Sequence, residues 1–248
     1  MTEEHVTSAE AIAAGPEEVW AAITTASGSE AWSFRADVEP NEGGAVRLHR
    51  GPFAPDAAAT VTAWEPPRRF AYEEPPSATE YLVEARDRGS CVVRVVSTFP
   101  GGTEWDDLAE EAGNGWRMSL LVLRAYVTHF AGLRSARLDL TAPVDAPVSA
   151  RAEVGAVVAT SLGVGGLTAG EEFHNALADG TVEHLGPYFT LLRATRPCPA
   201  LFAISSFPMD AVTLSVNVTG RLYGADAEAV ATRERPRWQD WLTRLTTQ

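Results

Sequence analysis

Four polar side chains in the first half of this 248-residue chain are of types that could do acid–base or ion-pair chemistry. Arg47 and His49 are two positions apart in an alternating segment, so on a strand they share one face. If they point inward, they could orient a carboxylate or polarise a carbonyl of a bound molecule. The alternation of Val46 and Leu48 with them favours the outward, solvated orientation instead. The other two candidates are Glu80 and Arg94.

Aromatic side chains are frequent in the same half and could line an apolar cavity in which a few polar groups orient a ligand. For any one of them, ordinary core packing is the alternative. Trp116 is the leading candidate, because the apolar stripe of a long helix turns it toward the sheet, where its indole N–H would need a partner. With Arg47 and His49, the candidate ligand-binding residues are Trp32, Phe34, Trp64, Tyr72, Tyr81, Trp116 and Leu120.

The sequence contains no convincing set of catalytic residues. Its candidate serines lack the surroundings of a nucleophile elbow. Glu171 and His174 are three positions apart and could meet only if that stretch is helical, and a metal ion would need further ligands there. We therefore expect no catalytic residue, no metal and no cofactor. Whether the protein is an enzyme stays open, and the sequence favours a protein without catalytic activity.

The first half alternates in a way that predicts an antiparallel meander closed by a long helix. A strand over 5–14 ends at Gly-Pro, and a helix over 16–26 and a short helix over 28–34 follow. Turn signals then separate six strands, and the long helix covers roughly 103–133. The six strands are expected at 35–39, 45–50, 58–64, 69–72, 80–85 and 91–99.

The second half repeats this order, with a strand at 138–144, a helix at 148–162, four more strands, and a terminal helix at 225–245 that Pro236 should bend or split. Pro16 is opposite Pro147, and 67–72 is opposite 199–204, at nearly the same sequence separation. A tandem duplication explains this agreement better than two unrelated strand-rich segments that share proline turns. The expected fold is α+β: an antiparallel sheet curved around a long C-terminal helix, in two units, 1–135 and 136–248.

Four motifs of the first half resemble one family. Residues 16–24, Pro-Glu-Glu-Val-Trp-Ala-Ala-Ile-Thr, are similar to the opening helix of the SRPBCC (START-like, Bet v 1-like) superfamily, and most resemble its Hsp90-ATPase-activator-homologue-like (AHSA1-like) branch. Trp32-Ser33-Phe34 stands where that branch has a tryptophan-phenylalanine element, and 61–72 resembles its central hairpin. Gly115-Trp116 resembles the Gly-Trp of its last helix. The resemblance covers about 6–133; the second half, whose helix has no Val-Trp, resembles a degenerate copy.

The resemblance implies a helix-grip fold with a cavity between sheet and helix, and non-catalytic binding of a small hydrophobic or amphipathic molecule. Two alternatives stay open: a polyketide cyclase or aromatase-like enzyme, and a chaperone-related or other protein-interaction module. An Hsp90 activator would be expected to present a basic face, whereas this chain has no lysine and a net charge of −13. We therefore carry over the fold and not the chaperone role.

The composition of the chain limits the classes of partner that it is expected to bind. A net charge of −13 and a sequence pI near 4.8 disfavour binding to nucleic acid. No apolar run is long enough for a membrane span, and the acidic N-terminus lacks the apolar stretch of a secretory signal, so we expect a cytoplasmic protein. A small apolar molecule is the expected partner, and a protein partner is left open.

Overall fold

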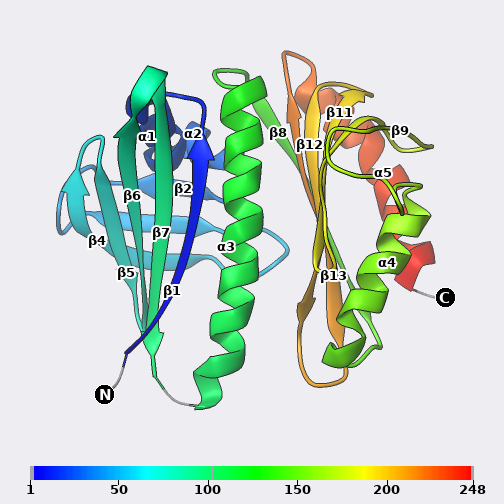
Figure 1. Ribbon diagram of the computed structural model, residues 1–248, viewed down its shortest axis with the longest axis horizontal. Coiled ribbons are helices and arrows are strands. Elements are labelled where there is room, and N and C mark those ends of the chain that lie inside the picture. Colours follow the sequence, from blue (N-terminus) through cyan, green and yellow to red (C-terminus); the bar gives the residue numbers. More distant parts are fainter. Residues whose placement is uncertain (1–2, 102, 247–248) are drawn as a thin grey trace. The chain divides into compact units, whose positions relative to one another are not determined.

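The structure, a computed structural model, describes residues 3–101 and 103–246, without the side chains of residues 3 and 103–109. The chain divides into two units, Met1–Ala131 and Gly132–Gln248, and each contains one antiparallel sheet with its own helices (Figure 1). The sequence placed the boundary a few residues later, between 135 and 136.

The first unit contains a seven-stranded sheet in the order β1-β7-β6-β5-β4-β3-β2, so its first and last strands are neighbours and the others form a meander. Buried and exposed residues alternate along most strands, as expected for a sheet with one covered face. The strands are β1 (Glu3–Ile12), β2 (Arg35–Val38), β3 (Ala45–His49), β4 (Ala57–Glu65), β5 (Arg69–Glu74), β6 (Ser77–Arg86) and β7 (Ser90–Pro100).

Two short helices connect β1 to β2. Helix α1 (Pro16–Thr24) begins with proline at its first position and has Glu17 and Glu18 in its first turn, where the helix dipole favours acids. Thr25 ends α1 and caps α2 (Ala26–Glu30), because its hydroxyl accepts a hydrogen bond from the Gly28 N–H at 3.1 Å. The chain therefore turns sharply between the two helices.

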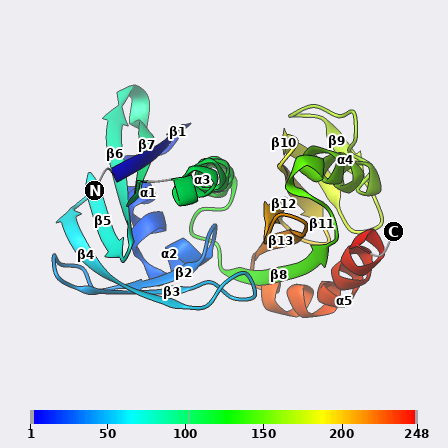
Figure 2. The ribbon, with the colours of Figure 1, turned by 90° about the horizontal axis from the view of Figure 1, so that it is seen from below.

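Helix α3 (Thr103–His129) has its close backbone contacts with the sheet at β1 and β7. Figure 2 looks along this helix and shows the sheet curving from β1 to β2 around α1, α2 and one side of α3. The C-terminal part of the apolar stripe predicted from the sequence is buried, with Leu120, Leu123 and Val127 among its residues. The predicted helix-grip arrangement is thus confirmed for the first unit.

The second unit repeats this connectivity with one strand fewer, in the order β8-β13-β12-β11-β10-β9. Its strands are β8 (Ser135–Val144), β9 (Glu172–His174), β10 (Asp179–Leu185), β11 (Phe189–Arg196), β12 (Ala200–Pro208) and β13 (Leu214–Tyr223). The short η2 (Val148–Ala150) and α4 (Arg151–Ser161) replace the two connecting helices, and α5 (Ala227–Thr246) contacts β8 and β13 as α3 contacts β1 and β7. The tandem helix-grip fold is therefore confirmed.

Three details of the second unit differ from the sequence analysis. In each sheet the first strand of the unit pairs with the last, and by this order β12 corresponds to β6 and β11 to β5. The predicted match of 67–72, on β5, with 199–204, on β12, is therefore wrong by one strand. Helix α5 continues through Pro236 and is not split, because its buried face, with Trp238 and Leu242, is held against the sheet. Residues 172–174 form β9, a strand that the sequence analysis did not predict.

Among the described residues, no helix has both the length and the apolar character that crossing a bilayer requires.

Candidate functional site

The candidate site lies on the inner face of the first sheet, which we define as the side that faces α1 and α3. Strand register places its central side chains: Tyr81 on β6 is opposite Phe70 on β5. Two residue pairs further along, Thr79 is opposite both Tyr72 on β5 and Ser97 on β7. Because side chains two positions apart on a strand share a face, these five residues point to the same side.

Ring contacts extend this arrangement into a continuous aromatic surface between α1 and α3. Tyr81 stacks on Phe70, with ring centres 6.0 Å apart, and meets Trp116 of α3 edge-on at 5.7 Å. Trp64 contacts Phe70 at 5.6 Å. These distances and angles are those of favourable aromatic pairs. We call this surface the aromatic wall; it consists of Trp20, Trp64, Phe70, Tyr72, Tyr81 and Trp116.

The wall becomes polar toward the β5–β6 turn. The indole N–H of Trp116 donates a hydrogen bond of 2.6 Å to the hydroxyl of Ser97. Beyond Tyr72, the guanidinium of Arg50 pairs with the carboxylate of Glu74, and both side chains are about three-quarters buried. We call these groups, together with Thr79, the polar end of the inner face.

The two tyrosines of the wall are protonated hydrogen-bonding groups at neutral pH. Burial raises the pKa of the Tyr72 phenol, although a hydrogen bond with Thr79 partly opposes the shift. Burial raises the pKa of Tyr81 well above its ordinary value, and the neighbouring Tyr72 adds to the effect. Among the described residues, no hydrogen-bond partner of the Tyr81 hydroxyl is found, although its side chain is only 7% exposed. These two phenols can therefore donate hydrogen bonds to a bound molecule.

The four polar candidates from the sequence lie on the opposite, outer face. Arg47 is exposed, while Val46 and Leu48 on either side of it are buried. Glu80 accepts a hydrogen bond of 2.6 Å from Arg69, and Arg94 lies 3.5 Å from the carboxylate of Glu84. Glu80 and Arg94 thus form surface ion pairs, which contribute little to stability.

His49 has a defined environment on this outer face. Its Nε2 lies 2.9 Å from a carboxylate oxygen of Asp37, and its Nδ1 lies 3.0 Å from Asp56. Hydrogen bonds with Asp37 first, and then with Asp56, raise the pKa of the imidazole. The histidine therefore connects β2, β3 and the segment before β4, and does not point toward the aromatic wall.

The other predicted residues fall into two groups. Trp64, Tyr72, Tyr81 and Trp116 belong to the aromatic wall, and Leu120 lies one helical turn after Trp116, 1% exposed. Trp32 donates its indole N–H to the Ala22 carbonyl at 2.8 Å, and Phe34 contacts Phe53 with ring centres 6.1 Å apart.

Six residues of the site were absent from the predicted set: Trp20, Arg50, Phe70, Glu74, Thr79 and Ser97. The strand period could have found Thr79, because it precedes the predicted Tyr81 by two positions and so shares its face. The same period places Glu74 on the face of Tyr72, but no comparable signal identifies its pairing with Arg50, because that contact crosses β4 from the end of β3 to β5.

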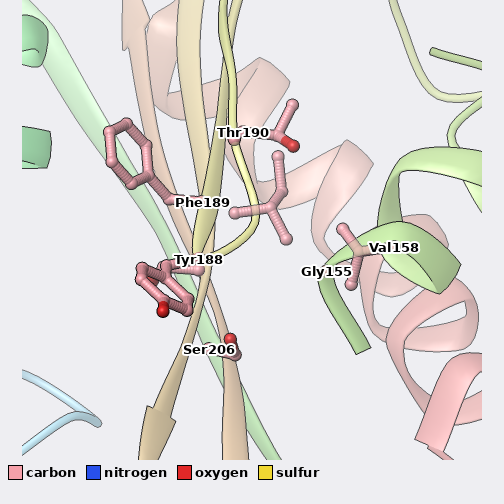
Figure 3. A pocket seen from close by; sticks show the side chains of 9 residues that line it. Gly155, Val158, Tyr188, Phe189, Thr190 and Ser206 are labelled. Atoms are coloured by element: carbon pink, nitrogen blue, oxygen red, sulfur yellow. The ribbon is translucent and has the colours of Figure 1, made fainter. Parts of the chain in front are cut away.

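The second unit fills the corresponding face with its own side chains. Trp238 of α5 is completely buried and stacks on Phe202 of β12, with ring centres 4.4 Å apart. Trp241 meets Trp238 edge-on at 5.7 Å. A pocket between α4 and β11–β12, with Gly155 and Val158 facing Thr190 (Figure 3), has room for about one water molecule.

The structure also bears on metal and thiol chemistry. Within residues 3–101 and 103–246, no three His, Cys, Asp or Glu side chains are grouped so as to hold a metal ion. Glu171 instead accepts hydrogen bonds from the N–H and hydroxyl of Thr168, at 2.6 and 2.9 Å. Both cysteines are free thiols, and burial raises the pKa of Cys91, which disfavours its nucleophilic thiolate.

Comparison with known proteins assigns the first unit. Residues 13–128 match the family of activator of Hsp90 ATPase homolog 1-like proteins. Over these residues the first unit contains an AHSA1-like domain, as the sequence motifs indicated. The second unit lies beyond the match. No protein of curated function matches the chain.

Solved structures similar to the chain include one that spans both units. The di-domain ARO/CYC protein BexL from the BE-7585A biosynthetic pathway is 16% identical, covers 99% of this chain and 96% of its own, and gives a TM-score of 0.45. The Aha1 dimer from Colwellia psychrerythraea is 19% identical over 52% of this chain and 99% of its own, with a TM-score of 0.44. Protein BH1534 from Bacillus halodurans is 21% identical over 51% and 99%, with a TM-score of 0.44.

Proposed function

We propose that the first unit binds a small amphipathic molecule on the inner face of its sheet and catalyses no reaction on it. The observation that carries this proposal is the aromatic wall, which grades along the same face into the polar end. Apolar ring surface and a few hydrogen-bonding groups on one concave face are the features of small-molecule sites.

The placement of α3 supports the same proposal. Its backbone contacts β1 and β7 closely, whereas over the rest of the sheet side chains make the contacts: Trp116 reaches Tyr81 on β6, and Trp20 of α1 reaches Trp64 on β4 and Phe70 on β5. Flat rings at such a position can shift to admit a ligand more easily than a helix backbone can. A ligand that buries about 200 Å² of apolar surface would gain about 5 kcal/mol before the costs of association.

The second unit has a structural role in this proposal. Trp238 and Trp241 occupy the face that would otherwise receive a ligand, and the pocket beside α4 is the size of a water molecule. This agrees with the interpretation of the second unit as a degenerate copy.

The two alternatives gain less support. A cyclase of the kind first considered would use Arg47 and His49, which face away from the wall. An Hsp90 activator, the activity in the family description, would use a basic surface, and this chain carries a net charge of −13. Binding therefore remains the proposal that the geometry favours.

The test is a fluorescence titration of the purified chain with phenylnaphthylamine, a neutral dye that brightens in apolar sites. Wild type is expected to bind it, and Trp116→Ala is expected to weaken binding about tenfold, because the ligand loses about 60 Å² of contact, or about 1.5 kcal/mol. Arg47→Ala, on the outer face, is the matched control and should change nothing.

Native mass spectrometry of the purified protein is the second measurement, since a co-purifying small molecule would identify the ligand class. The proposal is wrong if the dye does not bind, or if Trp116→Ala and Arg47→Ala bind it as tightly as wild type does.

A further inference from the structure

The charged groups on the inner face of the first unit already neutralise one another. Arg50 is paired with Glu74 at the polar end, where the two side chains are 26% and 25% exposed. Glu10 of β1, whose register places it on the same face opposite Val93, pairs with Arg124 of α3 at 2.5 Å. Neither arginine offers a positive charge without an existing carboxylate partner.

The remaining polar groups at this end are uncharged hydroxyls. Tyr72, Thr79, Tyr81 and Ser97 supply hydrogen bonds, and the two phenols stay protonated at neutral pH because burial raises their pKa values. Glu4, at the start of β1, lies by register on the same side and adds a further carboxylate. The described strand residues therefore give this face no net positive charge.

We propose that the ligand of the first unit is electrically neutral, and that anionic amphiphiles such as fatty acids are excluded from it. This inference rests on the proposed function. An anion would have to displace Glu74 from Arg50 and leave a partly buried carboxylate unpaired, or else lose its hydration beside neutral hydroxyls. A neutral molecule avoids both costs and can accept a hydrogen bond from the Tyr81 hydroxyl.

The experiment compares two dyes that share an anilinonaphthalene skeleton: neutral phenylnaphthylamine and its anionic sulfonate, anilinonaphthalene sulfonate. Three proteins are titrated at physiological ionic strength: wild type, Glu74→Gln and Glu84→Gln. Glu74→Gln releases Arg50 from its partner on the inner face. Glu84→Gln changes the net charge equally, but on the outer face, where Glu84 pairs with Arg86 and Arg94.

Wild type is expected to bind the neutral dye at least about tenfold more tightly than the sulfonate. Glu74→Gln should strengthen binding of the sulfonate about tenfold relative to the neutral dye, because an unpaired guanidinium now faces the site. Glu84→Gln should behave as wild type does. The double variant Arg50→Gln with Glu74→Gln removes both charges and should restore the preference for the neutral dye.

The outcomes separate the two proposals. Equal binding of the two dyes to wild type, or a sulfonate gain in Glu84→Gln as large as in Glu74→Gln, overturns neutrality and leaves binding on this face intact. Failure of both dyes to bind wild type overturns the proposed function itself. If Glu74→Gln loses its native circular dichroism, the double variant and the wild-type dye ratio still decide between these outcomes.

Discussion

The hydrogen bond between Trp116 and Ser97 fixes α3 against the sheet, and Ser97→Ala tests this role. The bond is 2.6 Å long, and its acceptor is a residue only 2% exposed. In the variant, the indole N–H faces an apolar methyl group in place of its acceptor. Leaving a buried donor unsatisfied costs about 1–3 kcal/mol, and the half-buried indole places this variant near the lower half of that range.

A double-mutant cycle separates the hydrogen bond from the packing. Trp116→Phe removes the N–H donor, so Ser97→Ala in that background has no bond to break and should cost less than about 0.5 kcal/mol. The coupling between the two positions should therefore be about 1 kcal/mol. A measured coupling of this size would show that the cost of Ser97→Ala comes from the lost hydrogen bond and not from a change in strand propensity.

Hydrogen exchange followed by mass spectrometry is the assay, because it reads the opening of each unit of the full chain separately. Ser97→Ala should speed exchange in the central parts of β7 and α3 about tenfold, as expected for a loss of about 1.4 kcal/mol. Unchanged exchange in these peptides, or the same cost in the Trp116→Phe background, would refute the reasoning.

Two further predictions concern pH and packing. The raised pKa of His49 means that its ion pairs stabilise the fold below about pH 6.5, and that this contribution of about 0.5–1 kcal/mol is lost as the pH rises through the folded-state pKa. Denaturant titrations at pH 6 and pH 9 should show this loss in wild type and not in His49→Gln; an equal loss in both would contradict it. Gly155→Ala should destabilise the second unit by about 2 kcal/mol or more, because the added methyl would lie 2.1 Å from the Pro187 carbonyl oxygen, and exchange in α4 should reveal it. The exposed Ala156→Ser is its control, and equal exchange in the two variants would show that α4 moves aside at little cost.

Local signals in the sequence predicted most of the elements. Pro16 after Gly15 with two acids behind it is a helix start that depends only on backbone geometry and the helix dipole, and α1 begins there. Alternation between turn signals predicted the six strands from β2 to β7 within a few residues. The short β9 was missed, because three residues are too few to display a period of two.

The candidate site was predicted only in its aromatic part. Tyr72, Tyr81 and Trp116 stand out because large rings on the buried side of an element must pack against something. Arg50 and Glu74 are 24 positions apart on strands with β4 between them, so only the completed sheet brings them together.

By itself, the sequence determined the two-unit helix-grip plan and the alternation of faces along most strands, because helix starts, turns and strand alternation are encoded within a few neighbouring residues. The tertiary structure decided which polar groups share the aromatic face and which neutralise one another there. Those pairings depend on the curvature and register of the whole sheet, which no local stretch of sequence contains.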